Sequence, residues 1–413
     1  MCAKVGYFDS RRIYISKVRL ITKQLFRAAD RRLAAAHTSV SMGIVLGLTV
    51  ITSLIISSLP APYAAITRLP APLGPLGRKV VPGSLPSAVA STVTVSHNYG
   101  FSAGELVWMD AARRDRQLDD MKAAGASWVR IDMQWYVVQP SNANTYDWSV
   151  YDRAIDAINR HNLRALVILD YAPAWAAIGG CKPSLSHKCA PADPQAFATY
   201  AAAAAARYTP RGVKSWEIWN EPNSPTFWSP GVDVIGYADL LKATYPAIKQ
   251  VNINATVITG GLRAAATGAD ISPYNFIAAL YNAGAKPYFD AIGAHPYSYP
   301  LLPSTAADAN GWGQMLKIHN IAIAEGDAAK KIWITEVGAS TGGPHPITEA
   351  HQAQILGEAL QLGRSSAWVG PFFWYDYKDL GTNRATGENF FGLVRFDGSH
   401  KPAYDSFVQA ARK

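Results

Sequence analysis

Most of this sequence carries little net charge of either sign. Nine of its 39 lysines and arginines, but only two of its 30 acidic residues, fall within residues 1–39, so this segment supplies +7 of the total charge of +9. The rest of the chain is close to neutral. A strongly basic protein would suggest nucleic acid as a partner, and the confinement of the charge to one end removes that suggestion. We therefore expect no nucleic-acid partner.

Cysteine is also scarce, with three residues in the chain. Cys2 lies in the basic segment, whereas Cys181 and Cys189 lie close together in a stretch rich in Gly, Pro and Ser. Outside the cell, two cysteines at this spacing are expected to form a disulfide within a loop. The alternative is a metal site that includes His187, but one histidine and two cysteines lack a fourth ligand nearby. We expect no metal.

Charged residues are absent from residues 40–59, a segment long enough to cross a bilayer as one helix. The basic residues before it fit the positive-inside rule, so residues 1–39 are expected to be cytoplasmic and the catalytic part to lie outside. Two alternatives stay open: a cleaved signal peptide, for which residues 61–65 offer small side chains, and a buried core helix. The protein is thus expected to be membrane-anchored, or secreted if this segment is cleaved.

Hydrophobic periodicity is missing from residues 60–92, where seven prolines are interspersed with Gly, Ser and Ala. Such a composition does not form a core and tends to extend. We interpret this segment as a linker that holds a catalytic domain, residues 93–413, away from the membrane.

From residue 94 onward, short β-rich runs alternate with helical stretches. The expected strands are residues 94–100, 127–133, 164–172, 214–220, 255–261, 289–295, 331–336 and 368–375. Eight such units are typical of an α/β protein with a (β/α)8 TIM barrel. No Gly-rich phosphate loop follows the first strand, which disfavours a doubly wound sheet. A hydrophobic content of 49% and an aromatic content of 11% support a large core with aromatic residues left to line a cleft.

Two carboxylates stand at expected strand ends, where TIM barrels build their active sites. Glu221 follows the fourth strand and Glu336 ends the seventh, so they are expected to face each other across the barrel mouth. Cleavage of a glycosidic bond needs such a pair, one protonated and one ionised. Arg130, near the end of the second strand, is expected to keep Glu336 ionised. Glu221 lies on a stiff turn before Pro222, and a poorly solvated position there suits the acid.

The motifs around these residues resemble those of clan A glycoside hydrolases. WEIWNEPN (216–223) resembles the Asn-Glu-Pro motif of strand 4, and IWITEVG (332–338) resembles the nucleophile segment of strand 7. AHPYS (294–298) and VRIDMQW (129–135) resemble the His/Tyr segment of strand 6 and the Arg segment of strand 2. Family 39, with its β-xylosidases and exopolysaccharide-cleaving enzymes, is the most similar, and the family 5 cellulases are next. The resemblance covers residues 94–411.

This resemblance implies a retaining glycosidase without a cofactor, in which Glu221 is the acid/base and Glu336 the nucleophile. It also implies substrate-binding roles for five residues: Asn220 at the 2-hydroxyl of the sugar, Arg130 and Tyr297 at the nucleophile, His295 near the acid/base or the sugar, and Trp374 as the floor of the subsite that holds the cleaved sugar.

Aromatic residues after the third strand are further candidates for sugar binding. Tyr171 and Trp175, in DYAPAW, are expected to stack on sugar rings, because aromatic faces pack against the apolar faces of pyranoses. Trp135 and Trp228 lie in other loops and fit sugar stacking or ordinary packing equally well.

Residues 93–413 leave no obvious room for the extra β-sandwich of the family 39 xylosidases, which favours an open groove. We therefore expect a monomeric enzyme that cuts β-linked polysaccharides or oligosaccharides internally. Two other classes stay open: a carbohydrate-binding barrel without turnover, and a metal enzyme with Glu221, His295 and Glu336 as ligands. The intact carboxylate pair disfavours the first, and the missing second histidine disfavours the other.

Overall fold

The part of the chain that the computed structural model describes comprises residues 98–181, 187–266, 268–305 and 310–412. The expected tail (1–39), membrane span (40–59) and linker (60–92) lie outside the described residues. Among the residues described, no helix is both long and apolar enough to cross a bilayer. The division of the chain before residue 93 therefore stays a prediction.

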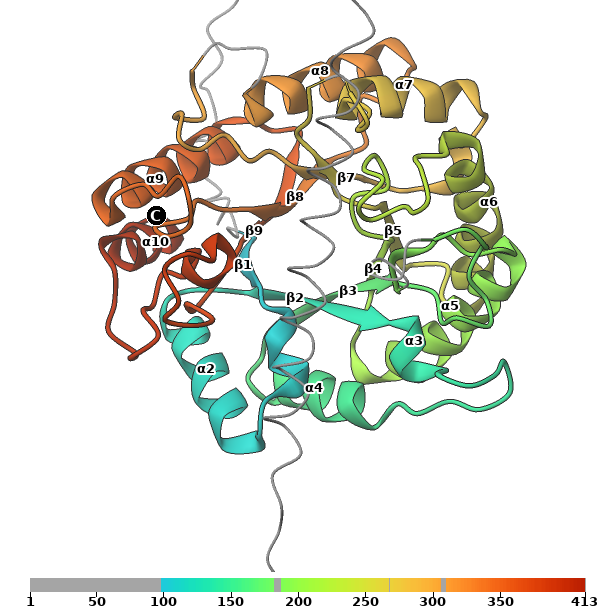
Figure 1. The fold of residues 1–413 in the computed structure, drawn as a ribbon, viewed down its shortest axis with the longest axis horizontal. Helices are drawn as coiled ribbons and strands as arrows, with labels where there is room; N and C mark the ends of the chain where they lie inside the picture. Colours follow the sequence, from blue (N-terminus) through green and yellow to red (C-terminus); the bar gives the residue numbers. More distant parts are fainter. Residues whose placement is uncertain (1–97, 182–186, 267, 306–309, 413) are drawn as a thin grey trace, which may run out of the picture. The chain divides into compact units, whose positions relative to one another are not determined.

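A curled parallel sheet lies at the centre of the fold (Figure 1). In the described part of the chain its strands are β1 (Tyr99–Ser102), β2 (Trp128–Gln134), β3 (Arg164–Asp170), β4 (Ser215–Ile218), β5 (Thr256–Thr259), β6 (Leu262–Arg263), β7 (Ile292–His295), β8 (Ile332–Val337) and β9 (Val369–Trp374). Neighbouring strands follow the order β5-β4-β3-β2-β1-β9-β8-β7-β6, and each of these pairings is parallel.

The two strands at the ends of this order belong to one position in the barrel. Gly260 and Gly261, the last two residues of the fifth expected strand (255–261), separate β5 from β6, which begins just beyond that strand. Both parts meet the same neighbour, because Ile258 of β5 bridges Ala291 just before β7, and β6 pairs with the end of β7. The sheet thus closes on itself, and its strands fit a (β/α)8 barrel.

Helices surround the strands on the outside (Figure 1). They are α2 (Ala111–Ala123), α3 (Trp135–Val138), α4 (Ser149–Arg160), α5 (Pro194–Tyr208), α6 (Val234–Val251), α7 (Pro273–Asn282), α8 (Gly311–Ala324), α9 (Glu349–Ser365) and α10 (Pro402–Ala411). Several begin at a polar side chain that accepts a hydrogen bond from a backbone amide of the first turn, as helix N-caps do: Asp110, Asp193, Asp233, Asn310 and Thr348.

Alternation along the strands divides the interior into two layers. Trp128 of β2 packs with Trp333 and Phe373 in a small cluster, whereas the apolar residues between Trp128 and Gln134 belong to the main core. Arg130 and Asp132 share the strand face of Trp128 because side chains alternate along a strand. These two polar residues therefore point into the barrel above its apolar floor.

A register shift in β8 gives Glu336 its direction. Ile334 belongs to the main core, and strict alternation would direct Glu336 to the same side. The pairing of β8 with β9 shifts between Ile334 and Val337, and such irregularities change the direction of a side chain. Glu336 lines the cavity at the barrel mouth instead.

The expected strands and the observed ones overlap at every position of the barrel. The largest shift is in the first strand, which was expected at residues 94–100, whereas β1 runs from Tyr99 to Ser102. Residues 94–97 lie outside the part of the chain that is described.

Candidate active site

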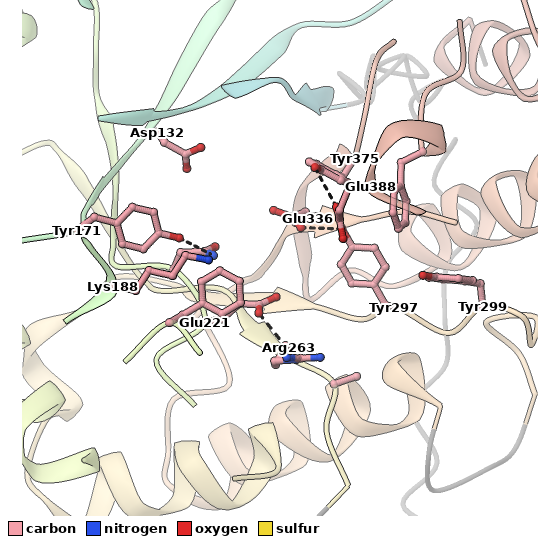
Figure 2. A pocket seen from close by; sticks show the side chains of 14 residues that line it. Asp132, Tyr171, Lys188, Glu221, Arg263, Tyr297, Tyr299, Glu336, Tyr375 and Glu388 are labelled. Carbon is pink, nitrogen blue, oxygen red and sulfur yellow. Dashed lines mark hydrogen bonds and ion pairs between the residues drawn. The ribbon is translucent and has the colours of Figure 1, made fainter. Parts of the chain in front are cut away.

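A cavity of about 680 Å³ opens where the C-terminal ends of the strands meet (Figure 2). Its lining is unusually rich in ionisable side chains. These are the acids Asp132, Glu221, Glu336 and Glu388, the tyrosines Tyr171, Tyr297, Tyr299 and Tyr375, and the cations Lys188 and Arg263. A concave site with converging polar groups is where a binding or catalytic function is expected.

Glu336 is held by two donors, one on each carboxylate oxygen. The hydroxyl of Tyr297 donates to Oε1 at 2.6 Å, and Nη1 of Arg130 donates to Oε2 at 2.8 Å. The side chain of Glu336 is 17% exposed, so one side of the carboxylate stays open to the cavity. Two fixed donors orient this carboxylate and leave it able to reach a ligand.

The surroundings of Glu336 keep it ionised. Burial by itself would raise its pKa, but the charges of His295 and Arg130 and the hydrogen bonds from Tyr297 and Arg130 outweigh burial and lower the pKa. Tyr297 remains a donor throughout, because burial and the nearby charge of Glu336 raise the pKa of its hydroxyl well above 10. An ionised, oriented carboxylate is suited to act as a nucleophile.

Glu221 lies on the opposite side of the cavity, on a sharply turned backbone. Glu221 has a φ of +44° and Trp219 has a φ of +71°, a region that residues other than glycine rarely adopt. The turn is held by the amide of Glu221, which donates to the carbonyl of Gly261 at 3.1 Å. Nδ1 of His295 lies 3.0 Å from Oε1, and Nε of Arg263 lies 3.8 Å from Oε2. Glu221 is therefore buried but aimed at the cavity.

The two carboxylates lie close enough to act on one bond. One oxygen of Glu221, one oxygen of Glu336 and a ring nitrogen of His295 all lie within 4.8 Å of one another. Such a group also matches the metal-ligand set considered from the sequence. Here, however, the Arg130 guanidinium sits 2.8 Å from Glu336 and would repel a bound cation. The donor set fits a carboxylate pair better than a metal centre.

Arg130 connects several strands from inside the barrel. Besides Glu336 on β8, it donates to Ser102 on β1 at 3.0 Å, to Glu217 on β4 at 2.7 and 3.3 Å, and to Asn220 at 3.1 Å. The side chain is 2% exposed. A buried guanidinium is stable only when its donors are paired, and here all three of its nitrogens are.

Glu217 was not selected from the sequence, because a carboxylate in the middle of a strand gives no sign of its partner. It is fully buried, and both of its oxygens accept from donors: Oε2 from Arg130, and Oε1 from Arg130 and from the amide of Gly261 at 2.8 Å. Glu217 has no contact with the cavity and acts by positioning Arg130. An acid three residues before Asn-Glu on an inward strand face is the signal that was available.

Most of the other predicted substrate-binding residues are near the cavity. Asn220 and Tyr171 line it, and Nδ2 of Asn220 donates to the hydroxyl of Tyr171 at 3.3 Å. Tyr297 also lines it, whereas His295 is fully buried beneath Glu221 and touches Thr335 through Nε2 at 3.1 Å. His295 is thus a positioning residue for Glu221.

Trp374 does not form the floor of the cavity as expected. It is fully buried, and its indole donates to the carbonyl of Phe391 at 3.2 Å. Tyr375, the next residue, lines the cavity instead, because successive side chains at the end of β9 point in opposite directions. The sequence had located the correct segment but was wrong by one residue.

Three tryptophans considered as stacking platforms from the sequence also lie outside the cavity lining. Trp175 is 36% exposed, donates to the carbonyl of Gln139 at 2.8 Å and packs edge-on against Trp135. Trp135 and Trp228 are buried in the core. Ordinary packing therefore accounts for Trp135 and Trp228, whereas sugar stacking by the partly exposed Trp175 stays a prediction.

A loop after β3 contributes residues that the sequence did not single out. Cys181 and Cys189 form a disulfide in this loop, with their Cα atoms 6.1 Å apart. Lys188, directly before Cys189, lines the cavity together with Arg263 at the end of β6. Asp132 is a further acid in the lining, and burial raises its pKa to about 6. These residues come from β2, from the loop after β3 and from β6, and only the closed barrel brings them together.

The family model for cellulase (glycosyl hydrolase family 5) matches residues 90–363, which is more than half of the chain. The chain belongs to glycosyl hydrolase family 5. This family 5 enzyme carries both carboxylates within the matched residues, and it is a glycosidase of clan A. The clan A resemblance inferred from the sequence is confirmed. The matching family model is that of family 5, which the sequence motifs had placed second after family 39.

Solved structures similar to this family 5 enzyme come from several glycosidase families. A family 39 glycoside hydrolase from the gut symbiont Bacteroides cellulosilyticus WH2 is 26% identical, with a TM-score of 0.62 over 76% of this chain and 63% of that one. The chain therefore spans less than two thirds of that protein. GH5_18 from Streptomyces cattleya in complex with GlcNAc is 18% identical (TM-score 0.56, covering 77% of this chain and 80% of that one). Xylanase 10B from Thermotoga maritima is 15% identical (TM-score 0.57, 77% and 95%). These last two support the fold alone.

The contacts of Glu217 predict a strong effect on stability. In Glu217→Gln, the amide nitrogen must face a donor whichever way it turns, either Arg130 or the amide of Gly261. We expect the free energy of unfolding to fall by about 3 kcal/mol, as when one partner of a buried ion pair is lost. Urea denaturation of the full chain, followed by circular dichroism, measures the change. The control Asp239→Asn breaks the exposed 3.0 Å pair with Lys242 and should cost less than about 1 kcal/mol. Equal losses would contradict the assignment.

The hydrogen bond from Tyr297 predicts a shift in the pH profile. Tyr297→Phe removes a donor that stabilises the ionised form of Glu336, so the pKa of Glu336 rises. With Glu336 acting as a nucleophile, activity needs this ionised form. We therefore expect the acidic limb of kcat/KM to move to higher pH and kcat/KM near neutral pH to fall about tenfold. Tyr299→Phe is the matched control, since Tyr299 lines the same cavity without a hydrogen bond to Glu336. An acidic limb that moves equally in both variants would rule out this role for Tyr297.

Proposed function

We propose that this family 5 enzyme hydrolyses β-linked polysaccharides with retention of configuration, with Glu336 as the nucleophile and Glu221 as the acid/base. The observation that carries the proposal is the short separation of the two carboxylates, with one oxygen of each within 4.8 Å. Retaining glycosidases hold their carboxyl groups about 5–5.5 Å apart, whereas inverting enzymes need about 6.5–9.5 Å to admit a water molecule.

The roles of the two glutamates follow from their different partners. In the first step, an oxygen of Glu336 attacks the anomeric carbon while Glu221 gives its proton to the departing glycosidic oxygen. Arg130 and Tyr297 hold Glu336 ionised and oriented for this attack. In the second step, Glu221 takes a proton from water, which attacks the glycosyl ester and releases Glu336. Asn220, beside Arg130 and Tyr171, is suited to bind a hydroxyl of the attacked sugar.

A polymer substrate is supported by space on both sides of Glu336. A second cavity of about 260 Å³ shares Asp132, Glu336 and Tyr375 with the first, so the two are adjacent. Trp108 lines this second cavity and is 57% exposed, as a platform for a sugar ring would be. Sugars bound in both cavities would flank the bond that is cleaved, which favours cutting within a chain.

The place of action is proposed from the sequence alone. Residues 40–59 would hold the enzyme in a membrane, residues 60–92 would extend from it, and the barrel would act outside the cytoplasm as a monomer. Cleavage of the N-terminal segment would release the same enzyme as a secreted protein.

Covalent trapping tests the nucleophile. A 2-deoxy-2-fluoro β-glycoside with a dinitrophenolate leaving group slows the second step, so a glycosyl ester accumulates. Peptide mass mapping should find the label on Glu336 and on no peptide of Glu336→Gln. Label on another residue would overturn the assignment. Added chelator should leave turnover unchanged. A loss of turnover in chelator would favour the metal alternative.

Azide rescue separates the two roles. Glu336→Ala and Glu221→Ala should each lose activity, by about 10²–10⁴-fold for the acid/base with poor leaving groups. With azide and an activated β-glycoside, Glu336→Ala should give the α-glycosyl azide, because azide occupies the place of the nucleophile. Glu221→Ala should give the β-glycosyl azide, because azide then attacks the glycosyl ester in place of water. Nuclear magnetic resonance of the products distinguishes them, and exchanged products would mean exchanged roles.

A further inference from the structure

Two basic side chains lie on the Glu221 side of the cavity, away from Glu336 (Figure 2). Lys188 holds its ammonium 3.9 Å from the ring centre of Phe227, and Arg263 reaches toward Glu221. Both line the cavity, and neither takes part in holding the nucleophile. The site as described so far gives them no task.

Lys188 is a partly desolvated cation with unused donors. In the described part of the chain, its half-buried ammonium makes no hydrogen bond or ion pair and rests only on aromatic rings. Burial lowers the pKa of Lys188, while the charges of Glu221, Asp170 and Glu388 oppose this. A partly desolvated ammonium with no acceptor from the described residues is costly, and a ligand that supplies one best explains this position.

The backbone holds Lys188 firmly in this position. Its carbonyl accepts from the amide of Ser229 at 3.0 Å, and the next residue is Cys189 of the disulfide. The amide of Ala190 in turn donates to the carbonyl of Ser229 at 3.0 Å. The ammonium is therefore carried on a fixed piece of chain beside the cavity, as a preorganised site requires.

Arg263 also has donors to spare. Its backbone is fixed by Asn223, whose side chain bonds the amide of Arg263 at 3.1 Å and its carbonyl at 2.9 Å. Its guanidinium lies at the outer limit of an ion pair with both neighbouring acids, 3.8 Å from Glu221 and 3.9 Å from Asp270. Within the described residues, the guanidinium makes no hydrogen bond. A planar fork of free donors matches a carboxylate.

We propose that Lys188 and Arg263 bind a carboxylate on the departing half of the substrate, which makes polysaccharides that contain a uronic acid the substrate class of this enzyme. The proposal rests on the proposed function, because Glu221 must protonate the leaving oxygen for the residues around it to contact the departing sugar. An ammonium and a guanidinium only donate hydrogen bonds, and an anionic acceptor satisfies both better than a neutral hydroxyl does.

The other charges of the cavity favour a singly charged anion. Glu336 and Glu388 line the same space and would repel a phosphate dianion more strongly than a carboxylate. A carboxylate also offers two oxygens, enough for one fork from Arg263 and one contact from Lys188. A sugar carboxylate is therefore favoured over a phosphate substituent.

The test compares charged and neutral forms of the same polymer. Glucuronate-containing polysaccharides are offered to the full-length enzyme beside their counterparts in which borohydride has reduced the activated carboxyl groups to alcohols. We expect kcat/KM to be at least about tenfold higher for the charged polymer, mainly through KM. Lys188→Met and Arg263→Met should each bring this ratio toward one. Added salt should weaken the preference as well.

Lys317→Met is the matched control, since it removes the same charge from a lysine that lies over the ring of Tyr274, outside the cavity lining. It should leave the ratio at its wild-type value. The proposal would be overturned if the wild-type enzyme cleaved both polymers with equal kcat/KM. It would also be overturned if Lys188→Met lowered kcat/KM by the same factor for both polymers. A preference for sulfated or phosphorylated polymers over the glucuronate form would overturn the choice of carboxylate.

Binding separates this inference from the catalytic proposal. Calorimetry with Glu336→Gln, which does not depend on turnover, should show tighter binding of glucuronate-containing oligosaccharides than of their reduced forms. Equal binding disproves the carboxylate site, even where trapping has labelled Glu336. Tighter binding of the charged form supports the site, even where trapping labels another residue and the catalytic roles have to be reassigned.

Discussion

The buried guanidinium of Arg130 is the group on which the rest of the site depends. It lies inside the barrel and is 2% exposed, so removing it from water is favourable only if every donor finds an acceptor. Those acceptors come from distant segments: Ser102 on β1, Glu217 and Asn220 on and after β4, and Glu336 on β8. Closing the barrel around this one cation therefore also fixes the nucleophile candidate.

The same arrangement makes two chemically identical residues different. Glu336 receives one donor on each oxygen and the nearby charge of Arg130, which lower its pKa. Glu221 has a histidine at 3.0 Å and a guanidinium only at 3.8 Å, on a backbone turned into the left-handed region. The close and unequally supported pair is the geometric basis for the proposed division into nucleophile and proton donor. The membership in family 5 and the similarity to clan A structures agree with this chemistry.

The proposed substrate specificity depends on residues that the barrel alone does not define. Lys188 comes from the disulfide loop after β3, Arg263 from the end of β6, and Tyr375 and Glu388 from the segments after β9. The sequence around these four residues has no common pattern, so none of them was selected from the sequence. In the loop that carries Lys188, only the cysteine pair Cys181 and Cys189 was selected. Trp374 and Tyr375 illustrate a second limit: periodicity located the strand end, but a shift of one residue exchanges a buried side chain for one that lines the cavity.

The sequence by itself determined the alternation of strands and helices, the barrel class and the strand ends that carry Glu221, Glu336, Arg130 and Tyr297. These follow from local periodicity and from short motifs, which depend on neighbouring residues only. The tertiary structure alone decided that Glu217 pairs with Arg130, that a register shift in β8 turns Glu336 into the mouth, and that Lys188 and Arg263 meet beside Glu221. Each of these depends on which residues of separate strands and loops become neighbours when the sheet closes, and no local pattern encodes that distance.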